Sequence, residues 1–172
     1  MPRLFVAVWP PEDVLHALAG LARPEIPGLR WTGREQWHVT LRFLGAVDDP
    51  APVVDALAEV GRLAPIGAVL GPSVGRFGHR VLHVPVAGLD ELAGQVVAGT
   101  AGLGRPPEDR AFSGHLTLAR VAKCARVDLR PLAGEAVVGR WTVDDVCLVE
   151  SRLSPTGARY EVLERVPLAS SA

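Results

Sequence analysis

The chain lacks the features that mark membrane proteins and secreted proteins. Among its 172 residues, no uninterrupted apolar stretch approaches the length of a membrane-spanning helix. The opening residues also lack the length and cleavage pattern of a signal peptide. Its two cysteines, Cys124 and Cys147, show no close-spaced ligand pattern, so we expect two reduced, partly buried thiols. These absences predict a cytoplasmic protein with no membrane partner.

Positive charge is not in excess either, and lysine is almost missing. Of the 18 basic residues only Lys123 is a lysine, and the formal net charge is −1. This balance argues against a protein held on nucleic acid mainly by bulk charge, because such domains are usually basic throughout. A local basic pocket remains compatible with it, since the planar fork of arginine suits phosphate recognition.

The hydrophobic pattern alternates between strand-like and helix-like segments within what we expect to be a single domain of residues 1–172. Strands are expected at residues 4–8, 37–44, 68–70, 81–86, 115–120, 143–150 and 160–167, and helices through residues 14–21, at 52–63 and through 89–103. Pro24, Pro27 and Gly28 are expected to close the first helix. Gly45 is expected to end the strand at 37–44, and residues 154–157 supply turn chemistry before the last strand.

The chain also carries a long-range repeat. Two His-x-Thr motifs, which begin at His38 and His115, lie 77 residues apart. The same shift places Leu4 on Val81, so that strand falls on strand, and it places the first helix on the third. This match predicts two similar lobes, each of which supplies one motif strand to a central cleft.

The two motifs place the same pair of side chains on one face of a strand, because residues i and i+2 share a face. His38 and Thr40 therefore point together, and His115 and Thr117 do the same. Arg42 has the parity of His38 and Thr40, so we expect it to project toward the same cleft.

Two imidazoles beside two hydroxyls suit displacement at phosphorus. The attacking and leaving oxygens lie roughly in line, so one histidine takes a proton from the nucleophile and the other gives one to the leaving oxygen. Imidazole titrates near neutrality, so a neutral and a protonated ring can coexist. The hydroxyls can donate to phosphate oxygens, and no metal is required.

These motifs resemble those of a known superfamily. Residues 38–41 (His-Val-Thr-Leu) and 115–118 (His-Leu-Thr-Leu) resemble the paired His-x-Thr-x motifs of the two-histidine phosphoesterases. Further segments look like its RNA 2′,3′-cyclic phosphodiesterase branch, also known as bacterial 2′-5′ RNA ligase: residues 3–8, 37–45, 112–120 and 150–160. The resemblance covers essentially the whole chain.

The resemblance implies a fold and a reaction. The fold is α+β, with two pseudo-symmetric lobes, each an antiparallel sheet with outer helices, around a central cleft. The reaction opens a 2′,3′-cyclic phosphate to leave a 2′-phosphomonoester. His38 would protonate the departing 3′ oxygen, His115 would activate water, and Thr40 and Thr117 would hold phosphate oxygens. No cofactor is implied, and we expect a monomer that acts on RNA ends or nucleotides.

The resemblance also implies an anion-binding arginine after the second motif and an aromatic residue after the first. Arg120 and Phe43 match these positions, each five residues past its histidine. On a regular strand both would face away from the cleft, so a bulge or the end of the strand must intervene.

Other interpretations stay open. The same site run backwards would join RNA halves through a 2′-5′ linkage, and a non-catalytic RNA- or nucleotide-binding protein could retain the cleft. A related activity on another small cyclic phosphate is a third alternative. His79 and His83 are spaced like a helical metal pair, but Pro85 and the strand-like setting argue against zinc. Tyr160 could stack on a base or pack within the sheet.

Overall fold

The computed structural model describes residues 3–155 and 157–169, and Thr156 in the expected last turn lies outside them. The strands are β1 (Arg3–Val8), β2 (Leu29–Trp31), β3 (Val39–Ala46), β4 (Ile66–Leu70), β5 (Gly75–Phe77), β6 (Val81–Ala87), β7 (His115–Val121), β8 (Gly139–Val143), β9 (Asp145–Ser154) and β10 (Gly157–Pro167). The helices are α1 (Glu12–Ala19), α2 (Ala51–Val60) and α3 (Asp90–Gly99). Within these ranges, no helix is long and apolar enough to cross a membrane.

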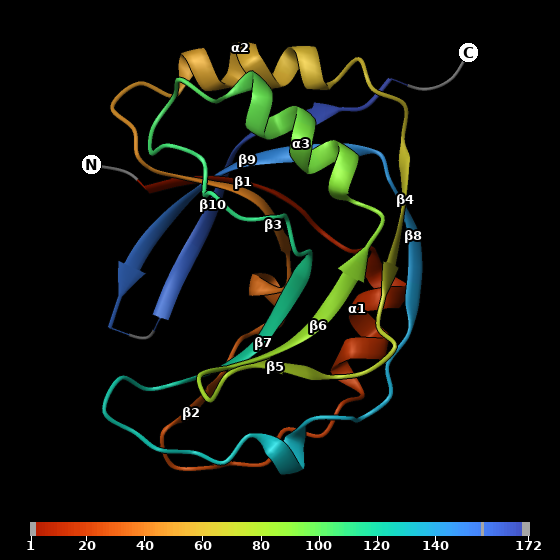
Figure 1. The fold of residues 1–172 in the computed structure, drawn as a ribbon, viewed down its shortest axis with the longest axis vertical. Coiled ribbons are helices and arrows are strands. Elements are labelled where there is room, and N and C mark those ends of the chain that lie inside the picture. The colour runs from red at the N-terminus through yellow and green to blue at the C-terminus, as the bar shows by residue number, and fades with distance from the viewer. Residues whose placement is uncertain (1–2, 156, 170–172) are drawn as a thin grey trace.

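The strands form one curled sheet in which every recorded pairing is antiparallel. Its order is β10-β9-β1-β3-β7-β6-β4-β8, while β2 pairs with β7 and β5 with β6. Helices α2 and α3 pack together and lie across one end of the sheet, whereas α1 lies beside β8 (Figure 1). The helices therefore cover the outside of the sheet, and the concave face that contains the motif strands stays uncovered.

The repeat in the sequence corresponds to a repeat in the fold. A shift of 77 residues carries β1, α1 and β3 onto β6, α3 and β7. The two motif strands meet at one recorded pair, Val39 opposite Leu116, and these residues are themselves 77 apart. A pseudo-two-fold axis therefore passes through this pair. Each lobe also contains a strand from the other half of the sequence. Strand β4 of the first half pairs with β6 of the second, and β9 of the second half pairs with β1 of the first.

Each motif strand contains a β-bulge three residues after its histidine. The pairing of β3 with β1 passes over Leu41, and the pairing of β7 with β6 passes over Leu118. An extra residue inverts the alternation of side chains along the strand. Leu41 and the next residue are consequently both buried, and Leu118 and its successor likewise. The residues five positions after each histidine, Phe43 and Arg120, therefore lie on the concave face of the sheet.

The bulge at Leu41 overturns the expectation for Arg42. This arginine is only 5% exposed, and its guanidinium points away from the cleft. It donates to the carbonyl oxygens of Val97, Leu103 and Arg105 at 3.4, 3.2 and 2.9 Å. Burial lowers the pKa of Arg42 from its ordinary value. Arg42 therefore fastens the end of α3 and the following loop to β3, and the prediction that it faces the cleft is wrong.

Most of the expected elements are present, with shifted ends. The first helix ends at Ala19, before the prolines expected to close it, and β3 continues through Gly45 to Ala46. Gly45 adopts a φ of +71°, which favours glycine, and the side chain of Arg105 lies against it. The short strands β2, β5 and β8 were not expected.

Replacing Arg42 tests its structural role. We expect Arg42→Met to lower the free energy of unfolding by about 3 kcal/mol, because it removes the hydrogen bonds of a buried guanidinium to three partly buried backbone carbonyl oxygens. Urea denaturation measures this change. Arg62→Met is the control, since Arg62 makes an exposed ion pair with Glu59 that is worth at most about 1 kcal/mol. Equal losses in the two variants would contradict the assignment.

Candidate active site

The concave face of the sheet holds a polar cavity of about 220 Å³. Its lining residues are Phe5, Thr32, Gln36, His38, Thr40, Phe43, His115, Thr117, Arg120, Ser151 and Tyr160. Every site residue expected from the sequence except Arg42 is among them. A second cavity, between Trp37 and Leu118, measures only about 10 Å³, which is too small for a nucleotide.

The backbone fixes both histidine rings in the same way. The Nδ1 atom of His38 lies 2.7 Å from the carbonyl oxygen of Gln36, and that of His115 lies 2.8 Å from the carbonyl oxygen of Ser113. A carbonyl oxygen only accepts, so each Nδ1 carries the hydrogen and donates it. Nε2 is then the nitrogen available for chemistry on each ring. In His38 it lies 3.1 Å from the hydroxyl of Thr40.

His38 sits in an aromatic environment. Its ring centroid lies 5.0 Å from that of Phe5, 5.1 Å from that of Trp9 and 5.0 Å from that of Tyr160. The pKa of His38 is lowered to about 4, chiefly by burial among these rings; the hydrogen bond to Gln36 opposes this shift, and the nearby charges of Arg120 and His115 add to it. His38 is therefore neutral at pH 7 in the unliganded protein.

His115 has a different environment. Its ring lies 4.9 Å from that of Phe77 and 5.8 Å from that of His83, and Phe77 also contacts His83 at 3.8 Å. His83 is buried opposite Thr117, and burial together with the charge of His115 lowers the pKa of His83 to about 4. A neutral ring thus lies behind His115. Across residues 3–155 and 157–169, no cluster of three or more acidic, histidine or cysteine residues could hold a metal.

The remaining polar groups suit an anion. Arg120 is exposed at the cavity, and its Nη2 makes a long contact of 3.5 Å with the hydroxyl of Thr117. Phe43 is 42% exposed, and the guanidinium of Arg105 lies 6.0 Å from its ring. The two motif imidazoles, the two motif threonine hydroxyls and the guanidinium of Arg120 therefore line one cavity and offer the donors that a phosphate needs.

Two lining residues that the sequence did not single out support the motifs. The hydroxyl of Thr32 lies 2.9 Å from the carbonyl oxygens of both Thr117 and Leu118, at the second bulge. The amide of Gln36 donates to the carbonyl of Ala158 at 2.6 Å and ties the first motif to β10. Thr32 directly follows β2, a strand too short to predict, whereas Gln36 lies two residues before His38, a position from which it can anchor the motif.

Both motif strands fall inside segments that match a known protein family. Residues 8–70 and 83–160 match the family model described as LigT like Phosphoesterase. The chain is a LigT-like phosphoesterase. The superfamily suggested by the paired motifs is thereby confirmed.

Curated relatives of this LigT-like phosphoesterase carry the name RNA 2′,3′-cyclic phosphodiesterase. The Aeropyrum pernix protein is 32% identical over 80% of this chain and 85% of its own length. The Thermus thermophilus protein is 30% identical over 96% of this chain and 90% of its own. The Geobacillus stearothermophilus protein is 29% identical over 91% of this chain, which spans only 53% of that relative.

Solved structures confirm the expected α+β fold. The crystal structure of TT0787 of Thermus thermophilus superimposes with a TM-score of 0.80 at 33% identity, over 99% of this chain and 100% of that one. E. coli LigT complexed with 3′-AMP gives a TM-score of 0.70 at 26% identity, over 98% and 99% of the two chains.

The lowered histidine pKa values predict acid sensitivity. His38 and His83 bind a proton less readily in the folded chain (pKa about 4) than at their ordinary value of 6.5. Their stabilising contribution is therefore complete above pH 6.5 and is lost as the pH falls toward 4. We expect His83→Gln to lose less stability than wild type between pH 7 and 5 in urea titrations. His16→Gln, at an exposed site on α1, is the control, and parallel losses in all three proteins would contradict the prediction.

Proposed function

We propose that this LigT-like phosphoesterase is an RNA 2′,3′-cyclic phosphodiesterase that opens the cyclic phosphate to a 2′-phosphomonoester. The observation that supports it most is the arrangement of His38 and His115, whose Nδ1 atoms both donate to backbone carbonyl oxygens and whose rings line one polar cavity. The names of the curated relatives support the same activity.

In the proposed reaction, water attacks phosphorus while the bond from phosphorus to the 3′ oxygen breaks. His115 accepts a proton from the water at Nε2, and His38 donates a proton from Nε2 to the departing 3′ oxygen. Thr40, Thr117 and Arg120 hold the non-bridging oxygens and offset their charge. The 2′ oxygen keeps the phosphate, and His115 releases the proton that it took from water to the solvent.

The role of His38 as proton donor depends on the substrate. In the unliganded cavity the ring is neutral, because it is buried and lies near Arg120 and His115. A cyclic phosphodiester brings one negative charge into the cavity, which opposes the charge of Arg120 and favours protonation of His38. We therefore propose that His38 gains its proton as the substrate binds.

The same proposal includes the biological setting. RNA ends and nucleotides with a 2′,3′-cyclic phosphate are the substrates, and Phe43 or Tyr160 stacks against the terminal base. Residues 1–172 act as one two-lobed domain, as a monomer and without a cofactor. A cytoplasmic location agrees with the two free cysteines, Cys124 and Cys147.

Substitution of either histidine tests the acid–base pair. We expect His38→Ala and His115→Ala each to lower kcat on 2′,3′-cyclic AMP by about 10²–10⁴, because each removes one proton transfer. The assay contains a chelator and identifies whether 2′-AMP or 3′-AMP forms. His16→Ala, which alters an exposed histidine far from the motifs in sequence, is the control. More than a tenth of wild-type activity in both motif variants would refute the pairing.

Two further measurements on the wild-type protein distinguish the alternatives. Joined product from tRNA halves with cyclic phosphate and 5′-hydroxyl ends would favour 2′-5′ ligation. Tight binding of 2′,3′-cyclic AMP with no turnover by the wild-type protein would favour a non-catalytic binding protein.

A histidine titration tests how His38 is protonated. In ¹⁵N-labelled protein, we expect the pKa of His38 to lie near 4 without ligand. Addition of 2′-AMP should raise it to roughly 5–7, because an anion within contact distance favours the charged ring. Thr40→Ala serves as a comparison, since it leaves the ring's burial and charged neighbours in place. A His38 pKa that stays near 4 in the complex would instead assign His38 as the proton acceptor.

A further inference from the structure

A second arginine lies directly beside Arg120. Strand β2 pairs with β7 so that Arg30 is opposite Arg120, and directly opposed residues of antiparallel strands lie on the same face. Thr32, the residue that follows β2, donates its backbone N–H to the carbonyl oxygen of Leu118 at 2.9 Å and lines the cavity. Arg30 therefore extends the polar surface of the cavity outward by one step along β2.

This arrangement is unfavourable in the protein alone. Like charges directly opposite each other on neighbouring strands destabilise a sheet. Across the described ranges, the side chain of Arg30 makes no hydrogen bond or ion pair, and that of Arg120 makes only its long contact with the Thr117 hydroxyl. The two guanidinium groups thus share one exposed surface with no carboxylate to balance them.

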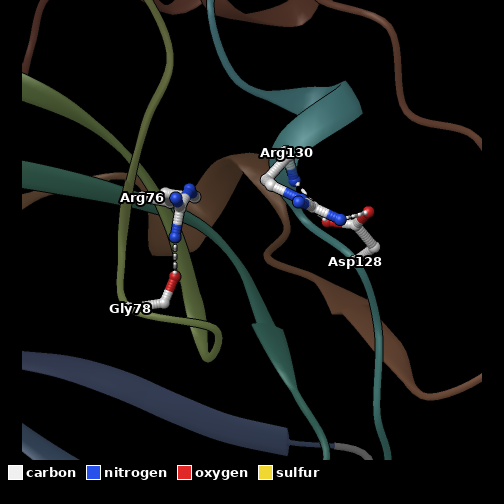
Figure 2. Close-up of polar contacts among 4 residues, drawn as sticks. All are labelled: Arg76, Gly78, Asp128 and Arg130. Carbon is white, nitrogen blue, oxygen red and sulfur yellow. Dashed lines mark hydrogen bonds and ion pairs between the residues drawn. The ribbon is translucent and has the colours of Figure 1, made fainter.

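Other arginines of the same lobe are used differently. Figure 2 shows Arg130 bound to Asp128, with a closest ion-pair distance of 2.9 Å, and Arg76 donating to the carbonyl oxygen of Gly78 at 2.7 Å. Arg76 lies next to Phe77 on β5, so it projects from the opposite face of that strand. Both side chains find partners within their own segments, which leaves Arg30 and Arg120 as an unbalanced pair at the cavity.

We propose that Arg30 binds the internal phosphodiester that precedes the terminal nucleotide of an RNA strand, while Arg120 contacts the terminal phosphate. The inference rests on the proposed function and specifies its substrate as an oligonucleotide rather than a free nucleotide. Directly opposed residues of antiparallel strands have Cβ atoms about 5 Å apart, and two arginine side chains that diverge from there can reach successive phosphates of an extended strand. A guanidinium at that position can donate two hydrogen bonds to one phosphate.

Three substrates measure the contribution of the internal phosphate charge to catalysis. They are 2′,3′-cyclic AMP, the dinucleotide ApA with a terminal 2′,3′-cyclic phosphate, and the same dinucleotide with an uncharged methylphosphonate linkage. We expect wild type to prefer the charged over the uncharged dinucleotide by about fivefold in kcat/KM. Arg30→Gln should abolish this preference. Arg76→Gln removes an equal charge from the opposite face and should retain it.

Binding measurements separate this inference from the proposed function. We expect Arg30→Gln to bind fluorescent ApA with a terminal 2′-phosphate several-fold more weakly than Arg76→Gln does. Its salt dependence should also be shallower, by about 0.7 in the slope of log affinity against log salt. Equal binding and equal slopes would overturn the role of Arg30, even if the enzyme hydrolyses 2′,3′-cyclic AMP. A binding difference without any turnover would support Arg30 and refute the hydrolase assignment.

Thermal stability provides a measurement that needs no RNA. Relief of the like-charge contact should raise the Tm of Arg30→Gln above that of wild type in a low-salt buffer without multivalent anions. Inorganic phosphate should then raise the Tm of wild type more than that of Arg30→Gln. A variant that is less stable than wild type in both buffers would indicate a purely structural role for Arg30 and contradict the proposal.

Discussion

The site depends on a single backbone constraint, the extra residue that each motif strand carries three positions after its histidine. Before the bulge, the alternation of a regular strand puts histidine and threonine on the open face. After it, the inverted alternation brings Phe43 and Arg120 to that same face. A regular strand would have turned Arg42 into the cleft and Phe43 into the core. The bulges therefore decide which side chains can meet a phosphate.

The two lobes share a backbone plan but surround their histidines differently. The carbonyls of Gln36 and Ser113 hold the rings in equivalent orientations. His38 then packs among aromatic rings, whereas His115 lies between Phe77 and the cavity with His83 behind it. Unlike environments around like groups are how proteins separate an acid from a base. The duplication thus supplies matched positions, and the residues around each position supply the chemical difference.

Local pattern and repeat length were enough to predict the central strands, the three helices and the relation between the lobes, because each depends on periodicity along the chain. Arg42 was misplaced because a bulge leaves no signature in side-chain alternation, although the positions of Phe43 and Arg120 required one. Strands β2 and β5 span three residues each, which is too short for a recognisable period. The contributions of Thr32 and His83 arise only from pairing across the sheet, so a linear pattern could not reveal them.

The exchange of outer strands between the halves limits how such a chain could have originated. Strand β4 completes the sheet of the second half and β9 completes that of the first, while the axis through Val39 and Leu116 relates the two. A polypeptide of half this length would leave an apolar sheet edge uncovered and would carry a lone imidazole. In a homodimer whose two copies exchanged their edge strands, each sheet edge would be covered and the cleft would contain two imidazoles. The present chain has the architecture expected from the fusion of such an intertwined homodimer, after which the two centres were free to diverge.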